Sequence, residues 1–138
     1  MLLVTQESVL FSHSLRFNLD PAQKYADCEL INALEKTGVV CDSNFNLDTV
    51  IDENLKLSAG QKKLIVIARG LLKNCKIVCL DEVTSNLDVE SDEKITNMLY
   101  SEFKSATIIH ISHRLENLKQ CDLIICLKNG YISEMDSL

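Results

Sequence analysis

The stretch Ile77-Val78-Cys79-Leu80-Asp81-Glu82 decides the fold class, because a short, continuous apolar run ends there in two acidic residues. A run that is apolar at successive positions is typical of a strand buried on both faces of a parallel sheet. Further runs of this kind lie at residues 2–4, 106–111 and 123–127. The segments between these runs have helical periodicity, so the sequence predicts an α/β protein with a largely parallel sheet covered on both sides.

Three helices are expected from start and stop signals. Asp27 can cap a short helix that Gly38 ends, a second helix opens at Ser58, and a third covers about residues 89–103. The positions expected to be buried are Leu30, Ile31 and Leu34 in the first helix, Leu64, Ala68, Leu71 and Leu72 in the second, and Ile95, Met98, Leu99 and Phe103 in the third. Near the C-terminus, Asn129-Gly130 predicts a type I′ hairpin that returns the chain through Tyr131 and Ile132.

Composition narrows the class of function. The chain has 138 residues, of which 46% are apolar and 25% charged, and 20 acidic against 14 basic residues give a net charge of −6. This sign disfavours nonspecific nucleic-acid binding. No apolar run approaches the 18 or so residues of a membrane span, and the N-terminus has no signal-peptide pattern. Six cysteines occur without C-x-x-C spacing, so we expect reduced thiols and a cytosolic compartment.

The acid pair Asp81-Glu82 is the first candidate for chemistry. In open α/β sheets, ligands bind outside the carboxyl ends of the strands. Two acids there can hold a hydrated Mg²⁺ and activate a water molecule, as phosphoryl transfer requires. The alternative is that the acids only mark where the sheet meets solvent.

The second candidate is Leu57-Ser58-Ala59-Gly60-Gln61. Ser58 and Gln61 fit the S-x-x-Q capping box, which is sufficient as a structural explanation. The same geometry also suits an anion, because free N–H groups and the positive end of the helix dipole converge there. Gly60 would let a phosphate approach the backbone closely. His113, after the strand at 106–111, and Gln6, after the first strand, are equally ambiguous when considered alone.

The order of these features is far more specific than any one of them. Gln6, LSAGQ at 57–61, IVCLDE at 77–82, SNLD at 85–88 and His113 follow one another along the chain. In this order the chain resembles the nucleotide-binding domain of ABC transporters over essentially its whole length, with these five elements as Q-loop, signature motif, Walker B strand, D-loop and switch histidine. The stretch LFSHSLRFNLDP at 10–21 resembles exporters of the multidrug-resistance-associated class, although His13 stands where that family usually has glycine.

The resemblance implies a role for each matching residue. Asp81 would bind Mg²⁺, with Gln6 linking this metal site to the membrane domain, and Glu82 would be the general base for the attacking water. His113 would contact the γ-phosphate of ATP. The residues expected at the interface with the ATP of a second, opposing nucleotide-binding domain are Ser58, Gly60, Gln61 and Asp88.

The resemblance also implies an organisation. Residues 1–7 would end the Q-loop strand, 8–56 form a helical subdomain, and 57–138 carry the signature helix, Walker B strand, D-loop, switch histidine and C-terminal hairpin. The fold would be that of a P-loop NTPase of the ABC type. No G-x-x-x-x-G-K-[ST] motif occurs in the sequence, so we expect the Walker A lobe, with its phosphate-cradling loop, to be absent from this chain.

Three functions remain open at this point. In the first, the chain is the C-terminal part of an exporter's ATPase domain, at the cytoplasmic face of a membrane, joined to transmembrane domains in one longer protein and inactive alone. In the second, it is a truncated, non-catalytic partner whose LSAGQ completes the ATP site of another domain. In the third, it belongs to a soluble ABC ATPase of the DNA-repair or translation type, which the acidic charge and the exporter-like stretch disfavour.

Overall fold

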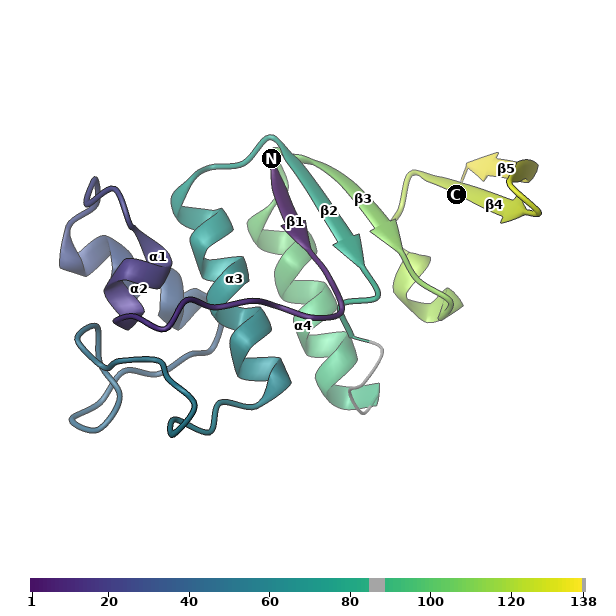
Figure 1. The fold of residues 1–138 in the computed structure, drawn as a ribbon. Helices are drawn as coiled ribbons and strands as arrows, with labels where there is room; N and C mark the ends of the chain where they lie inside the picture. The colour runs from purple at the N-terminus through teal and green to yellow at the C-terminus, as the bar shows by residue number, and fades with distance from the viewer. Residues whose placement is uncertain (85–88, 138) are drawn as a thin grey trace.

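The computed structural model describes residues 1–84 and 89–137 as five strands, four α-helices and one short 3₁₀ helix (Figure 1). In chain order, these elements are β1 (Leu2–Val4), α1 (Leu15–Leu19), α2 (Asp27–Lys36), α3 (Ala59–Leu72), β2 (Ile77–Asp81), α4 (Val89–Glu102), β3 (Thr107–Ile111), the 3₁₀ helix η1 (Leu115–Leu118), β4 (Leu123–Lys128) and β5 (Tyr131–Ser137). The expected strands and helices are therefore present, close to their expected bounds.

Strands β1, β2 and β3 form one parallel sheet with β2 in the centre. One face of this sheet packs on helices α3 and α4; in Figure 1, α4 lies behind the strands and α3 lies to the left of β1. Val4, Val78 and Leu80 are buried there against Ile67 of α3 and Leu99 of α4. The α/β class and the parallel sheet are thus confirmed.

The second face of the sheet is bare, so the expectation of cover on both sides is wrong for the described residues. Leu3, Ile109 and Ile111 point to this face and are 54%, 52% and 57% exposed. The strands are apolar at successive positions, which is a pattern typical of burial on both faces. Within the described residues, however, both helices that pack on the sheet lie on the same side of it.

Helix α3 stands between two hydrophobic clusters. Val66 and Ile67 face the sheet, whereas Ile65 and Ala68 face a second cluster built with α1, α2 and the loops around them. The single buried stripe expected for this helix is therefore wrong. Four consecutive residues, 65–68, are buried, whereas Leu64, Leu71 and Leu72 are only partly buried. A helix that is apolar on more than one side is typical of a position inside a core.

Local signals account well for where helices begin. Ser58 caps α3 by accepting a hydrogen bond from the Gln61 N–H at 3.1 Å, and the Gln61 side chain accepts one from the Ser58 N–H at 2.9 Å, which completes the expected capping box. Helix α2 differs from expectation, since its N-cap is Ala26 and not Asp27. The Glu29 carboxylate accepts the Ala26 N–H at 2.8 Å and takes over part of the capping.

The exporter-like stretch at 10–21 is held by a buried asparagine. The side-chain amide of Asn18 donates to the carbonyls of Phe11 and Ser14, and its oxygen accepts the Phe11 N–H at 2.8 Å. The ring of His13 stacks on Phe17 with centroids 4.1 Å apart. This stacking gives His13 a packing role at the position where the family usually has glycine.

The C-terminal hairpin β4–β5 forms at Asn129-Gly130, whose φ angles of 52° and 81° suit the expected turn. It stands apart from the sheet in Figure 1. Strand β4 was expected to be buried, but Leu123, Ile125 and Leu127 are at least 49% exposed. The apolar run predicted the strand correctly and its burial wrongly, since no described element covers the hairpin.

All six cysteines lie within the described residues and are free thiols. None of the described helices is both long and apolar enough to cross a bilayer.

Candidate functional site

The carboxyl edge of the parallel sheet brings several of the candidate residues to one place. Asp81 is the last residue of β2, and Glu82 follows it directly. Because β1 and β2 are parallel and Val4 is paired with Leu80, the loop that carries Gln6 leaves the sheet at the same edge. His113 reaches this edge from the loop after β3, the other neighbour of β2.

Glu82 and His113 are in direct contact. The Glu82 carboxylate oxygen Oε1 lies 3.1 Å from Nδ1 of His113. A carboxylate can only accept a hydrogen bond, so Nδ1 carries the proton in this contact. Both side chains are partly open to solvent, at 37% and 63% exposure, so a ligand can reach the pair.

The backbone at Glu82 is strained, with φ at 47° in the left-handed region. A non-glycine residue there costs roughly 1–3 kcal/mol and persists only where its surroundings fix it. The Glu82 N–H donates to the carbonyl of Ile111 at 3.0 Å, which ties the turn to the end of β3.

A buried lysine holds the same turn from the side of α3. The ammonium of Lys63 donates to the Val83 carbonyl at 2.5 Å, and the residue is only 4% exposed. Burial lowers the pKa of Lys63, because desolvation disfavours its charged form. Lys63 therefore links the helix that begins with LSAGQ to the residue after Glu82.

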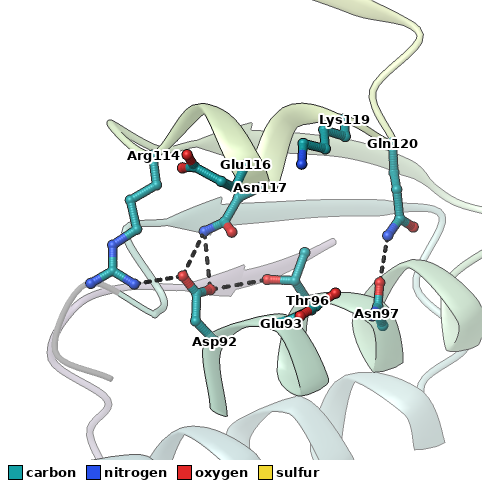
Figure 2. A pocket seen from close by; sticks show the side chains of 9 residues that line it. All are labelled: Asp92, Glu93, Thr96, Asn97, Arg114, Glu116, Asn117, Lys119 and Gln120. Carbon is teal, nitrogen blue, oxygen red and sulfur yellow. Dashed lines mark hydrogen bonds and ion pairs between the residues drawn. The ribbon is translucent and has the colours of Figure 1, made fainter. Parts of the chain in front are cut away.

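A buried carboxylate holds the turn from the side of α4. Asp92 lies at the base of an open groove of about 570 Å³ between α4 and η1 (Figure 2). Burial opposes ionisation of Asp92, yet its pKa is lowered because hydrogen bonds to the charged form outweigh this effect. The donors to this carboxylate are Thr84, Arg114, Asn117 and Thr96.

The lowered pKa of Asp92 predicts a loss of stability in acid. A carboxyl group whose pKa is lower in the folded than in the unfolded chain stabilises the fold fully above its unfolded pKa of about 3.9. That contribution disappears as the pH falls through the lower, folded pKa. The free energy of unfolding, measured with urea, should therefore fall less between pH 7 and pH 3 for Asp92→Asn than for the unmodified chain. The control is Glu93→Gln, which changes the exposed neighbour and should lose as much stability as the unmodified chain. Equal losses in all three would contradict the prediction.

The LSAGQ residues form a separate group at the N-terminus of α3. Ser58 and Gln61 are exposed and Gly60 is half-buried. The hydrogen bond from α3 to the Glu82 turn comes from Lys63, which lies further along the helix than these residues. Asp88, together with SNLD at 85–88, lies outside the described residues.

Comparison with known proteins identifies this arrangement. The family described as ABC transporter matches residues 1–85, which is more than half of the chain. The chain belongs to the ABC transporter family. Its sheet and flanking helices are accordingly part of a P-loop NTPase fold.

The relatives that match nearly the whole chain include members of the C family of ABC transporters. The chain is 37% identical to multidrug resistance protein fer6 of Mycosarcoma maydis over 136 residues, 36% identical to putative ABC transporter C family member 15 of Arabidopsis thaliana over 139, and 39% identical to metal resistance protein YCF1 of Saccharomyces cerevisiae over 140. Each match covers 98% of this chain but only 10%, 13% and 9% of the relative.

ABC transporters use ATP and commonly Mg²⁺, and the sheet edge suits this metal. Asp81 at the end of β2 and Gln6 in the loop after β1 carry a carboxylate and an amide oxygen, which are the hard oxygen donors that Mg²⁺ prefers. Among the described residues, no group of three or more His, Cys, Asp or Glu side chains is placed to hold a metal ion.

Sequence reasoning missed Lys63, Asp92 and Asn117, although each holds the Glu82 turn in this ABC transporter domain. Lys63 is one of two adjacent lysines, and Asp92 lies in the acidic run VESDEK. From sequence alone, both residues have the pattern of charged side chains on a solvent-exposed surface. One feature of the sequence could have pointed to Asp92, namely its position four residues after the end of the SNLD motif.

Proposed function

We propose that this chain is the C-terminal part of an ATP-binding domain in an ABC exporter and takes part in ATP hydrolysis that drives transport across a membrane. The observation that carries the proposal is the 3.1 Å contact of Glu82 with His113 at the carboxyl edge of the parallel sheet, beside Asp81. A base, an orienting imidazole and a metal-binding carboxylate at one edge are the groups that phosphoryl transfer requires.

Each residue of the edge has a defined task in this proposal. Glu82 accepts the proton of the water molecule that attacks the γ-phosphorus, while His113 orients the Glu82 carboxylate through Nδ1. The imidazole Nε2 can donate to a phosphate oxygen when the ring carries both protons. Asp81 and Gln6 hold Mg²⁺, which neutralises charge on the phosphate oxygens when bound.

The partners follow from the exposed group on α3. The exposed Ser58 and Gln61 and the half-buried Gly60 lie at the N-terminus of a 14-residue helix. In this proposal they bind the phosphates of ATP held by a second nucleotide-binding domain in a head-to-tail pair, and Asp88 contacts that second domain. Transmembrane domains of the same longer protein would place the chain at the cytoplasmic face of a membrane. Nucleic acid has no part in this proposal.

A chimera tests the proposal. The chimera is the yeast relative YCF1 with the segment that matches this chain replaced by the 138 residues. Mg²⁺-dependent ATP hydrolysis is measured for the purified chimera and for the isolated 138-residue chain. We expect turnover in the chimera and none in the isolated chain, whose sequence has no phosphate-cradling glycine-lysine motif.

The alternatives give different results in the same assay. A chimera that folds and binds ATP without hydrolysing it would contradict the proposal and favour the non-catalytic partner. Mg²⁺-dependent turnover by the isolated chain would contradict the expectation that it is inactive alone.

A further inference from the structure

The carboxylate of Asp92 connects two loops that are far apart in the sequence. Oδ2 lies 2.7 Å from Nη1 of Arg114, and the Asn117 side-chain amide donates to both carboxylate oxygens, at 3.0 and 3.2 Å (Figure 2). Thr96, one turn along α4, donates to Oδ1 at 3.3 Å. Only 5% of the Asp92 side chain is exposed, so these contacts replace water as its hydrogen-bonding environment.

Two of the contacts made by Asp92, those with Thr84 and Arg114, are to residues close in sequence to the proposed catalytic pair. Thr84, two residues after Glu82, hydrogen-bonds to the Asp92 carboxylate, and its Oγ1 also accepts from the Asn117 amide at 3.3 Å. Arg114 directly follows His113. The network therefore joins the residues that follow Glu82 to those that follow His113, with α4 as the common support.

The catalytic pair needs such a support. Glu82 has a strained backbone, and both it and His113 are partly exposed, so the 3.1 Å contact between them is not fixed by burial. Thr84, Asp92 and Asn117 are all buried. Buried, hydrogen-bonded side chains that support an exposed catalytic pair can hold its geometry to a fraction of an ångström.

We infer that Asp92 is a positioning residue for ATP hydrolysis, which holds Glu82 and His113 against each other by anchoring the segments that follow them to the start of α4. This inference rests on the proposed function for its catalytic consequence. Its structural part, the dependence of the Glu82–His113 contact on Asp92, stands independently of that function.

The structural part is tested in the full 138-residue chain by NMR of the His113 imidazole nitrogens. Glu82→Gln first gives the signature of an altered contact with His113. We expect Asp92→Asn to move the His113 resonances toward those of Glu82→Gln. The control, Glu93→Gln, removes a charge from the exposed neighbour and should leave the His113 resonances where they are in the unmodified chain. Asn117→Ala is the second variant, because it cuts the bridge to Thr84 without removing a charge, and it should shift them too.

Two results would overturn the inference. Unmodified His113 resonances in folded Asp92→Asn and Asn117→Ala would show that the pair does not depend on the network. Loss of the fold in both variants, measured by circular dichroism, would show that the network supports the whole chain and not the pair.

The catalytic part is tested in the chimera. Asp92→Asn should lower kcat by about tenfold to a hundredfold, the usual result of misplacing reacting groups, and leave the KM for ATP unchanged. An unchanged kcat in this variant would overturn the positioning role. An inactive unmodified chimera would contradict the proposed function instead, and the His113 resonances would then decide whether Asp92 holds the pair.

Discussion

Glu82→Gln in the chimera should reduce ATP turnover by about 10²- to 10⁴-fold, which is the range that a general base contributes. Glutamine keeps the size and hydrogen-bonding reach of the side chain but cannot take up the proton of the attacking water. ATP binding should persist, since Glu82 is not among the residues assigned to hold the nucleotide. Single-turnover hydrolysis and equilibrium binding of ATP, measured on the same preparation, separate the two effects.

The matched control is Glu93→Gln, which removes one carboxylate from an exposed position of α4 with no assigned role. Its turnover should equal that of the unmodified chimera. Undiminished hydrolysis by Glu82→Gln would remove Glu82 from the role of base, whatever its contact with His113.

Leu80→Ala should destabilise the chain by about 2–5 kcal/mol, the usual cost of emptying a buried leucine site. Leu80 lies on the central strand β2, is 1% exposed and packs in the cluster shared by the sheet, α3 and α4. Domains of this size are stable by only about 5–15 kcal/mol, so this one change removes a large fraction of the total. Urea unfolding followed by circular dichroism measures the effect.

Leu3→Ala provides the control on the opposite face of the same sheet. Leu3 is 54% exposed, so its truncation should change stability by no more than about 0.5 kcal/mol. Equal destabilisation by both substitutions would mean that the bare face is covered in solution.

The elements that sequence predicted correctly are those that depend on neighbours along the chain. The capping box of Ser58 and Gln61 and the turn at Asn129-Gly130 each involve at most four consecutive residues, and their backbone geometry follows from local hydrogen bonds and permitted φ angles. The structure brings Asp81, Glu82 and His113 to one edge of the sheet, because parallel strands end at a common edge.

The predictions that were wrong concern burial, which depends on parts of the molecule distant in sequence. Leu3 and Leu123 are as apolar as Leu80, and nothing in their own segments distinguishes which of the three meets a packed helix. The same reasoning explains why Lys63 and Asp92 were missed. Their type suggests solvent, and only the packing of α3 and α4 against the Glu82 turn makes them buried contacts.

The position of α3 between two hydrophobic clusters has a consequence for folding. Ile65 and Ala68 belong to the cluster with α1 and α2, and Val66 and Ile67 belong to the cluster with the sheet. Neither cluster can be completed without this helix, and the loss of either cluster leaves one side of the helix unpacked. We therefore expect the helical part and the sheet to melt together in one cooperative transition and not as two independent folding units.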